Sequence, residues 1–328
     1  MLFSAYGLFS GMALLEVKNV FKKEGETDAV NGISFVQKPF QKIGISGETG
    51  SGKTTLLKMI AGFVQPDAGE LYFKGRKVIG PLDQLIPGHP GIGYLSQHFE
   101  LRNNYWVNDF LDMANKLSDE EAKRIFTVCE IDHLLRRRTH QLSGGEKQRI
   151  AMARLLITSP SLLILDEPYS NLDAMHKATM KRVVQEAGVQ FNTSFILVSH
   201  EPADLLSWAD TLLLLKAGRI IQQGTPAEVY NNPVDVYAAG LLGEYSYVDA
   251  GLFDDVFRGD ERRMILRPHQ LTLTAKGEHS VEAVVTAIHY RGSYSLLELA
   301  VKQERLYLLQ TNISVQKGDT VYVAIAEA

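Results

Sequence analysis

Two different patterns of hydrophobic positions divide the chain near residue 242. Before it, continuous apolar runs such as LLILD at 162–166 and SFILV at 194–198 alternate with longer segments rich in helix-forming residues. Continuous apolar runs of this length are typical of strands buried on both faces, and strands that alternate with helices predict a parallel α/β sheet. After residue 242, short segments alternate apolar and polar positions, which is typical of strands with one exposed face.

The second pattern predicts a small β-barrel. Gly318 in VQKGD supplies a positive φ for a tight turn between two of its strands. About five short strands in fewer than ninety residues indicate a barrel of the OB type. The segment 243–261 is interpreted as a linker that leads into it. The strand-like runs lie at 281–290, 293–301, 305–310 and 320–326.

The first part of the chain has two further features. Strand-like segments at 13–19, 32–36 and 70–75 predict an antiparallel flank beside the parallel sheet. Residues from about 98 to 142 are rich in helix formers and charged residues, which predicts a helical segment. We therefore expect an α/β domain with an antiparallel β flank, followed by the small barrel.

The length, net charge and cysteine content of the chain exclude several classes of protein. With 328 residues, 45% of them hydrophobic and 22% charged, the chain is long enough for two ordinary globular domains. The net charge of −4 argues against a nucleic-acid-binding protein that relies on an overall basic field, and RRR at 136–138 is interpreted as a solvated helix end. Cys129 is the only cysteine, so no intrachain disulfide can form, which is compatible with a reducing compartment. Residues 1–15 are uncharged, but they lack the positive start of a signal peptide and are shorter than the about 20 residues of a membrane span.

The segment GETGSGKTT at 47–55 matches the P-loop pattern G-x-x-x-x-G-K-[ST] between a strand-like and a helix-like run. Its glycines allow successive backbone N–H groups to curl around the β- and γ-phosphates of a nucleotide. Lys53 adds a mobile positive charge there, and Thr54 can offer its hydroxyl to Mg²⁺. The predicted phosphate-binding residues are Gly47, Glu48, Thr49, Gly50, Ser51, Gly52, Lys53, Thr54 and Thr55.

Two acidic residues and a histidine follow buried strand-like runs. Asp166 and Glu167 end the run at 162–166, and ligands bind at the carboxyl ends of strands in α/β sheets. We expect Asp166 to hold Mg²⁺ through water and Glu167 to polarise or deprotonate the attacking water. An isolated histidine is more often structural, but His200 follows the next strand at the same sheet edge, so we expect it to contact the γ-phosphate.

The segment LSGGE at 142–146 precedes the helix-forming run KQRIAMARLL. Ser143 and Glu146 have the spacing of a capping box, in which each side chain satisfies a free amide at the helix start. Gly144 and Gly145 leave bare N–H groups at the positive end of the helix open to an anion. These four residues are therefore predicted to form a second phosphate-binding element.

The order P-loop, LSGGE, LLILDEP, SNLD and VSHE resembles the nucleotide-binding subunit of ATP-binding cassette (ABC) transporters, over roughly residues 14–233. The resemblance implies a P-loop NTPase that has a RecA-like parallel core and a helical subdomain. Such a subunit hydrolyses ATP with Mg²⁺ as cofactor. Gln97 matches the Q-loop glutamine, which contacts the metal or water, and Asp173 matches the D-loop aspartate at a dimer interface. The implied catalytic residues are Glu167, His200, Gln97 and Lys53, and the implied metal-site residues are Thr54, Gln97 and Asp166.

The resemblance also implies partners and a location. Ser143 and Gly145 of one copy face the γ-phosphate held by a second copy in a head-to-tail dimer. Transmembrane permease subunits are direct partners, a solute-binding protein is an indirect one, and no nucleic acid is expected. The subunit is expected at the cytoplasmic face of the inner (plasma) membrane, as a peripheral protein. LRP at 266–268 followed by short strands resembles the transport-associated OB (TOBE) module of ABC importers. Residues 243–328 are therefore interpreted as a linker and regulatory domain, with a ligand-binding barrel as the alternative.

Several positions depart from the family pattern. Glu24 stands where an aromatic residue usually stacks on adenine, and a carboxylate cannot replace an aromatic face. Either Phe21 substitutes for it or adenine is held weakly. Ser96 replaces a common phenylalanine near the Q-loop. Because this position faces the membrane partner, the departure leaves the identity of the permease open, but it does not change the expected ATPase chemistry. Because related subunits begin with a phrase like MALLEVKNV, residues 1–11 are interpreted as an extension and the nucleotide-binding domain as 12–242.

Other functions remain possible from the sequence. A soluble ABC ATPase that acts on ribosomes or DNA is one, although such proteins carry a second cassette or long insertions. An inactive nucleotide sensor is another, which the intact residues Lys53, Asp166 and Glu167 disfavour. An exporter subunit is the third, and the C-terminal barrel disfavours it. The transported solute is not encoded in this subunit.

Overall fold

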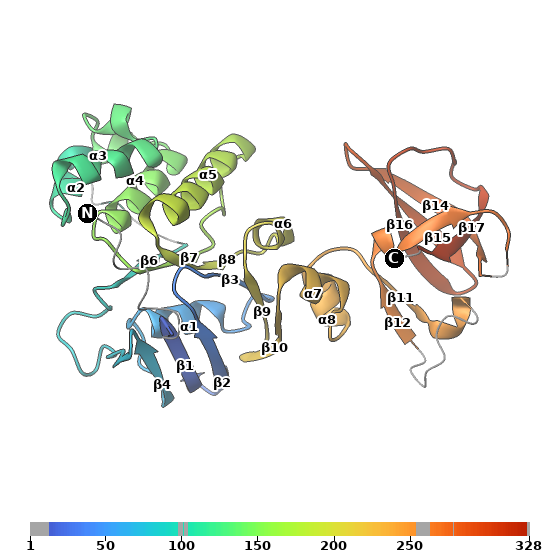
Figure 1. The fold of residues 1–328 in the computed structure, drawn as a ribbon, viewed down its shortest axis with the longest axis horizontal. Coiled ribbons are helices and arrows are strands. Elements are labelled where there is room, and N and C mark those ends of the chain that lie inside the picture. Colours follow the sequence, from blue (N-terminus) through green and yellow to red (C-terminus); the bar gives the residue numbers. More distant parts are fainter. Residues whose placement is uncertain (1–12, 98–100, 102–103, 254–262, 278, 327–328) are drawn as a thin grey trace, which may run out of the picture. The chain divides into compact units, whose positions relative to one another are not determined.

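The computed structural model describes residues 13–97, 101, 104–253, 263–277 and 279–326 (Figure 1). The expected extension at residues 1–11 lies outside the described residues. Contacts between Cα atoms divide the chain into two units, the first ending at Pro226 and the second beginning at Ala227. No helix in the described part of the chain is long and apolar enough to span a bilayer.

A six-stranded sheet forms the centre of the first unit, as the buried apolar runs predict. Its strand order is β10-β9-β3-β8-β7-β6, and all neighbours are parallel except β10 and β9. Every residue of β7 and β8 is buried, which explains the continuous apolar runs. The strands are β3 (Lys42–Ser46), β6 (Ile92–Leu95), β7 (Leu162–Asp166), β8 (Ser194–Val198), β9 (Thr211–Lys216) and β10 (Arg219–Gly224).

The predicted antiparallel flank is confirmed. It is a four-stranded sheet in the order β2-β1-β4-β5. The first helix, α1 (Lys53–Ile60), packs in one hydrophobic core with this flank and with the central sheet. The strands of the flank are β1 (Leu15–Glu24), β2 (Thr27–Gln37), β4 (Ala68–Phe73) and β5 (Arg76–Lys77).

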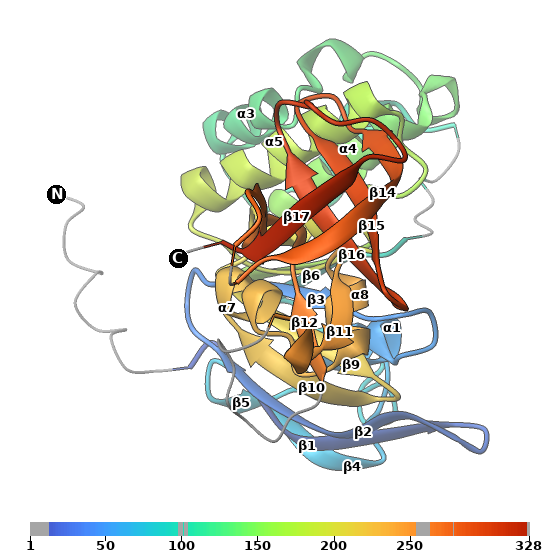
Figure 2. The same ribbon diagram turned by 90° about the vertical axis from the view of Figure 1, so that its right-hand side faces the viewer.

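The remaining helices of the first unit lie mainly on the other side of the central sheet. Figures 1 and 2 show α4 and α5 on the face opposite to α1. The predicted helical segment contains α2 and α3, and a capping box of Ser118 and Glu121 starts α3. The bounds are α2 (Val107–Asp112), α3 (Asp119–Val128), η1 (Asp132–Leu134), η2 (Thr139–Gln141), α4 (Gly144–Leu156), α5 (Ala174–Phe191) and α6 (Pro202–Leu206).

The second unit contains the predicted OB-like β-structure. Five antiparallel strands follow the order β13-β17-β14-β15-β16, and the outer strands β13 and β16 contact each other, so the sheet curls on itself. Gly318 has a φ of 97° in the turn before β17, as predicted. The elements are β11 (Ser246–Asp249), η3 (Ala250–Phe253), β12 (Arg263–Leu266), η4 (Pro268–Gln270), β13 (Leu271–Thr274), β14 (Val281–Tyr290), β15 (Ser295–Val301), β16 (Glu304–Gln310) and β17 (Thr320–Ile325).

The second unit also includes α7 (Pro226–Asn231), from Ala227 onward, and α8 (Val236–Leu241). Arg267, which is fully buried, links these helices to the segment that precedes β13. Its guanidinium donates hydrogen bonds to four backbone carbonyls, those of Tyr230 at 2.7 Å, Ala239 at 3.0 Å, and Gly243 and Glu244 at 3.2 Å. These carbonyls lie at the C-terminal ends of both helices, where partial negative charge favours a cation.

Replacing Arg267 by methionine should destabilise the second unit by about 3 kcal/mol or more, because several buried carbonyls lose their donors at once. Amides of α7 and α8 should then exchange with solvent faster in hydrogen-exchange mass spectrometry. The control is Arg263→Met on β12, because the Arg263 side chain is exposed and pairs with a single carboxylate, that of Glu304. Equal effects of the two substitutions would contradict this role for Arg267.

Candidate functional site

The P-loop is held between two strands that leave no room for a side chain at Gly47 or Gly52. It connects β3 to α1. A Cβ at Gly52, where φ is 96°, would lie 1.9 Å from the carbonyl oxygen of Ala29 on β2. A Cβ at Gly47 would lie 2.5 Å from the carbonyl oxygen of Leu215 on β9. No side chain of the described residues caps the start of α1, so its first amides are open to an anion.

Lys53 folds back over this loop. Its ammonium donates hydrogen bonds to the carbonyl oxygens of Gly47 at 2.7 Å and Glu48 at 2.8 Å. Burial lowers the pKa of Lys53, and the nearby carboxylates of Glu167 and Asp166 oppose that effect. The charge is therefore held at the loop, close to two carboxylates.

A cavity of about 300 Å³ opens beside the P-loop. It brings together residues from five separate parts of the sequence. Gln97, Asp166, Glu167 and His200 all line it, together with the loop residues, so these predicted positions converge. The lining residues are Glu24, Ala29, Thr49, Gly50, Gly52, Lys53, Thr54, Thr55, Gln97, Asp166, Glu167 and His200.

Asp166 lies at the end of β7 and is only 2% exposed. Its Oδ2 accepts a hydrogen bond from the hydroxyl of Tyr94 at 2.9 Å, and burial together with this carboxylate raises the pKa of Tyr94. Its Oδ1 is buried and has no hydrogen-bond partner among the described residues. An unpaired carboxylate oxygen that shares a cavity with Thr54 and Gln97 fits a hard cation such as Mg²⁺.

The protein alone does not complete such a metal site. No group of three or more His, Cys, Asp or Glu residues in the described ranges could hold an ion. Mg²⁺ commonly takes one or two protein ligands and fills its remaining positions with water and substrate phosphates. The sparse oxygen set therefore suits a metal that arrives with a nucleotide.

Glu167 and His200 face each other in the cavity. His200 Nε2 lies 3.0 Å from Glu167 Oε1. Burial raises the pKa of Glu167 to about 7, with Lys53 lowering it and Asp166 raising it further. Burial and the Lys53 charge lower the pKa of His200. At neutral pH, Glu167 is thus poised between its acid and base forms beside a neutral imidazole.

A hydrogen-bond network that no sequence motif predicts supports the His200 loop. Ser199 Oγ donates a hydrogen bond to Asp204 Oδ2 at 2.7 Å and accepts one from the Glu201 amide at 3.1 Å. Asp204 is buried and paired with two lysines of α5, Lys177 at 3.3 Å and Lys181 at 2.6 Å. The only sequence signal was an acidic residue four positions after the histidine, which is common on exposed helices.

LSGGE forms the predicted capping box. Ser143 Oγ accepts a hydrogen bond from the Glu146 amide at 3.3 Å, and Glu146 Oε2 accepts one from the Ser143 amide at 2.8 Å. A Cβ at Gly144 would meet nothing within 4 Å, so the helix start is open. Ser143, Gly144, Gly145 and Glu146 are not among the described residues that line the P-loop cavity. Within one chain, the two predicted phosphate-binding elements therefore do not share a cavity.

The remaining predicted residues occupy different places. Asp173 caps α5 through hydrogen bonds with the amides of Met175 and His176, both at 3.0 Å. Phe21 packs on Gly32 of β2 and is not among the described lining residues of the cavity. Glu24 does line the cavity, and its Oε1 accepts a hydrogen bond from Thr55 Oγ1 at 2.7 Å.

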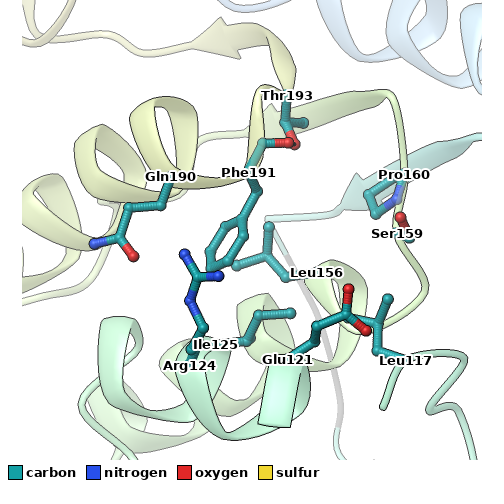
Figure 3. A pocket seen from close by; sticks show the side chains of 10 residues that line it. All are labelled: Leu117, Glu121, Arg124, Ile125, Leu156, Ser159, Pro160, Gln190, Phe191 and Thr193. Atoms are coloured by element: carbon teal, nitrogen blue, oxygen red, sulfur yellow. The ribbon is translucent and has the colours of Figure 1, made fainter. Parts of the chain in front are cut away.

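A second cavity of about 230 Å³ lies where α3 meets the ends of α4 and α5 (Figure 3). Ile125, Leu156 and Phe191 provide its apolar part, and Arg124 and Gln190 contribute polar groups. It shares no described lining residue with the P-loop cavity. No predicted site residue lines it.

Glu167→Gln should stabilise the nucleotide-free protein more at high pH than at low pH. A raised pKa gives the folded state a stability contribution that is present at low pH and lost as pH rises through the folded value of about 7. Glutamine resembles the neutral carboxyl, so the difference in melting temperature from wild type should be small near pH 5 and positive near pH 8, which lies above both the ordinary and the folded pKa of this glutamate. Thermal unfolding in EDTA measures it, with Glu120→Gln on α3 as control. A difference in melting temperature that does not change with pH would contradict a raised pKa of Glu167.

Comparison with known proteins gives matches over most of the chain. The family model "ABC transporter" matches residues 30–170, and the model "TOBE domain" matches residues 264–328. The chain is 36% identical over 301 residues to the Fe(3+) ions import ATP-binding protein FbpC 2 of Rhodococcus jostii, covering 86% of each protein. It is also 36% identical over 248 residues to the glucose import ATP-binding protein GlcV of Saccharolobus solfataricus, covering 73% of this chain and 70% of that protein.

Solved structures agree with these matches. cbiO1 of Clostridium perfringens, part of the ABC transporter complex cbiONQ, has a TM-score of 0.58 at 26% identity and covers 68% of this chain and 92% of its own. The ADP conformation of the ATP-binding cassette MJ1267 has a TM-score of 0.58 at 24% identity, with 71% of this chain and 100% of its own covered, and shows the same fold. The chain therefore belongs to the family of ATP-binding, ATP-hydrolysing subunits of ABC import transporters.

Proposed function

We propose that two copies of this chain close head-to-tail around two ATP molecules, and that hydrolysis between them drives solute import through a membrane permease. The observation that carries the proposal is the separation of the two phosphate-binding elements. The P-loop cavity holds the hydrolytic residues, whereas the open start of α4 is not part of it. A second copy of the chain supplies the missing donors if its Ser143 and Gly145 face the γ-phosphate.

The residues of the cavity have different roles in phosphoryl transfer to water. The P-loop amides and Lys53 bind and neutralise the phosphates, which is the main requirement of this reaction. Glu167 accepts a proton from the attacking water, for which a pKa near 7 is well matched. His200 contacts the γ-phosphate beside Glu167, and Gln97 orients the water.

Mg²⁺ fits the oxygen donors of this cavity. When bound, it neutralises charge on the phosphate oxygens. Thr54 would hold it through its hydroxyl, and Asp166 and Gln97 through their side-chain oxygens or through water. Tyr94 keeps Asp166 oriented, because its hydroxyl occupies the other carboxylate oxygen.

ATP drives closure of the dimer because it binds the closed state with higher affinity than the open state. A ligand shifts a conformational equilibrium only if it binds one state better than the other. ATP contacts both copies in the closed dimer and one copy in the open state. Hydrolysis removes the γ-phosphate that both copies share, so the dimer opens again.

The partners follow from the same arrangement. The helical segment at about 98–142 would face the permease, Gln97 would report nucleotide state to it, and a solute-binding protein would act on its far side. The subunit would then be peripheral at the cytoplasmic face of the inner membrane, with the OB-like unit as a regulatory domain. Two relatives of equal identity are named for chemically different solutes, iron and glucose, so this chain's solute is set by its partners.

Glu167→Gln should abolish ATP turnover and leave a stable dimer in ATP, because the variant binds nucleotide but cannot activate water. Sedimentation analysis with and without ATP–Mg²⁺ measures the dimer, and phosphate release measures turnover. Lys53→Ala is the control, since it should lose nucleotide binding and stay monomeric. A Glu167→Gln protein that remains monomeric in saturating ATP would refute the proposed dimer.

Base selectivity should be relaxed, with GTP competing more effectively than usual, because Glu24 offers no aromatic face in the cavity. Glu24→Tyr should strengthen ATP binding by about 1–3 kcal/mol, or roughly 5- to 150-fold, through base stacking. Phe21→Leu is the matched control and should change affinity little, because Phe21 packs on Gly32. Competition titrations measure both. ATP binding to wild type at least about a hundredfold tighter than GTP binding would show the prediction to be wrong.

A further inference from the structure

His176 of α5 lies directly against Gly145 of α4. A Cβ at Gly145 would fall 2.5 Å from His176 Cδ2 and 2.9 Å from its Cγ. Real Cβ atoms do not approach other atoms so closely, so the imidazole occupies the space that any side chain at position 145 would need. Gly145 is itself buried, so glycine at this position serves a packing contact within the chain.

The same imidazole is tied to Asp173. His176 Nδ1 lies 2.7 Å from Asp173 Oδ2, while Asp173 Oδ1 accepts hydrogen bonds from the amides of Met175 and His176. These hydrogen bonds lower the pKa of Asp173, so the carboxylate is ionised and Nδ1 carries the proton that it donates. The imidazole is therefore held by a hydrogen bond to Asp173 at the start of α5 and by packing against Gly145 of α4.

The residues around this contact are exposed at the surface. Asp173 is 64% exposed in its side chain and His176 is 36% exposed. Ser143, two residues before Gly145, is exposed as well and begins the open end of α4. The D-loop aspartate and the helix start that we propose to meet a second copy are thus joined through one side chain.

We propose that His176 is a positioning residue that sets the distance between the start of α4 and Asp173, so that both meet the second copy as one preformed surface. A surface that is already ordered loses less conformational freedom on binding, which strengthens association without a new contact. The inference rests on the proposed head-to-tail dimer. It concerns affinity between copies and leaves nucleotide binding by the single chain unchanged.

The two contacts of His176 can be removed separately. Asparagine places an N–H donor close to the position of Nδ1, so His176→Asn keeps the bond to Asp173 and loses the ring on Gly145. Phenylalanine keeps a flat ring on Gly145 and loses the donor. His176→Ala removes both.

The experiment measures ATP-dependent dimer dissociation constants by sedimentation in the Glu167→Gln background. His176→Ala should weaken the dimer about tenfold or more, and His176→Asn and His176→Phe should each restore part of the affinity. Binding of a fluorescent ATP analogue to dilute, monomeric protein and the melting temperature should stay close to the parent values. A role limited to folding would lower the melting temperature and show no separate effect on the dimer.

A double substitution tests the contact itself. Gly145→Ala should weaken the dimer strongly when His176 is present and much less when it is alanine, because the ring no longer blocks the methyl group. Gly144→Ala is the matched control, since a Cβ there meets nothing within 4 Å. Its effect should be the same in both backgrounds.

The outcomes separate the two proposals. If the Glu167→Gln parent stays monomeric in ATP, the proposed function falls and this inference with it. If the parent dimerises but His176→Ala dimerises equally well, only the inference is overturned. The same holds if Gly145→Ala weakens the dimer equally with and without His176.

Discussion

The close approach of two backbone carbonyls to the P-loop is the constraint on which the site depends. The carbonyl oxygens of Ala29 and Leu215 occupy the space beside Gly52 and Gly47, so the loop can follow only one path between β2 and β9. That path fixes the start of α1 and places Lys53 over the loop carbonyls. The antiparallel flank and the parallel sheet are therefore both required to shape one short loop.

Charge balance in the cavity follows from that path. Lys53 is buried beside two carboxylates; its charge opposes the rise in the pKa of Glu167, and the two carboxylates oppose the fall in the pKa of Lys53. Asp166 keeps one oxygen bonded to Tyr94 and the other unpaired, an arrangement that costs stability unless a cation or water satisfies it. A buried carboxylate oxygen that suits a cation better than it suits the fold is typical of sites in which function is favoured over stability.

The sequence predicted the elements whose chemistry is local, and it missed those that arise from packing between distant positions. The P-loop, the LSGGE capping box and the buried strands are set by spacing and apolar periodicity, so they could be read directly. Tyr94 beside Asp166, the Asp204 pairs and the ring of His176 on Gly145 each join residues from different elements, and no periodicity marks them. The contact between Arg267 and the carbonyls of α7 and α8 is of the same kind, because it joins positions that are 23 to 37 residues apart.

Arg267 has a consequence for how this protein can be shortened. The usual choice for isolating a catalytic domain is to cut in the segment after the last recognisable helix, here near residue 242. Such a shortened chain would keep α7 and α8 but lose the guanidinium that satisfies the carbonyls at their ends. A cut after β10, at Gly224 to Pro226, removes α7 and α8 together with Arg267, so no helix is separated from the guanidinium that binds its carbonyls.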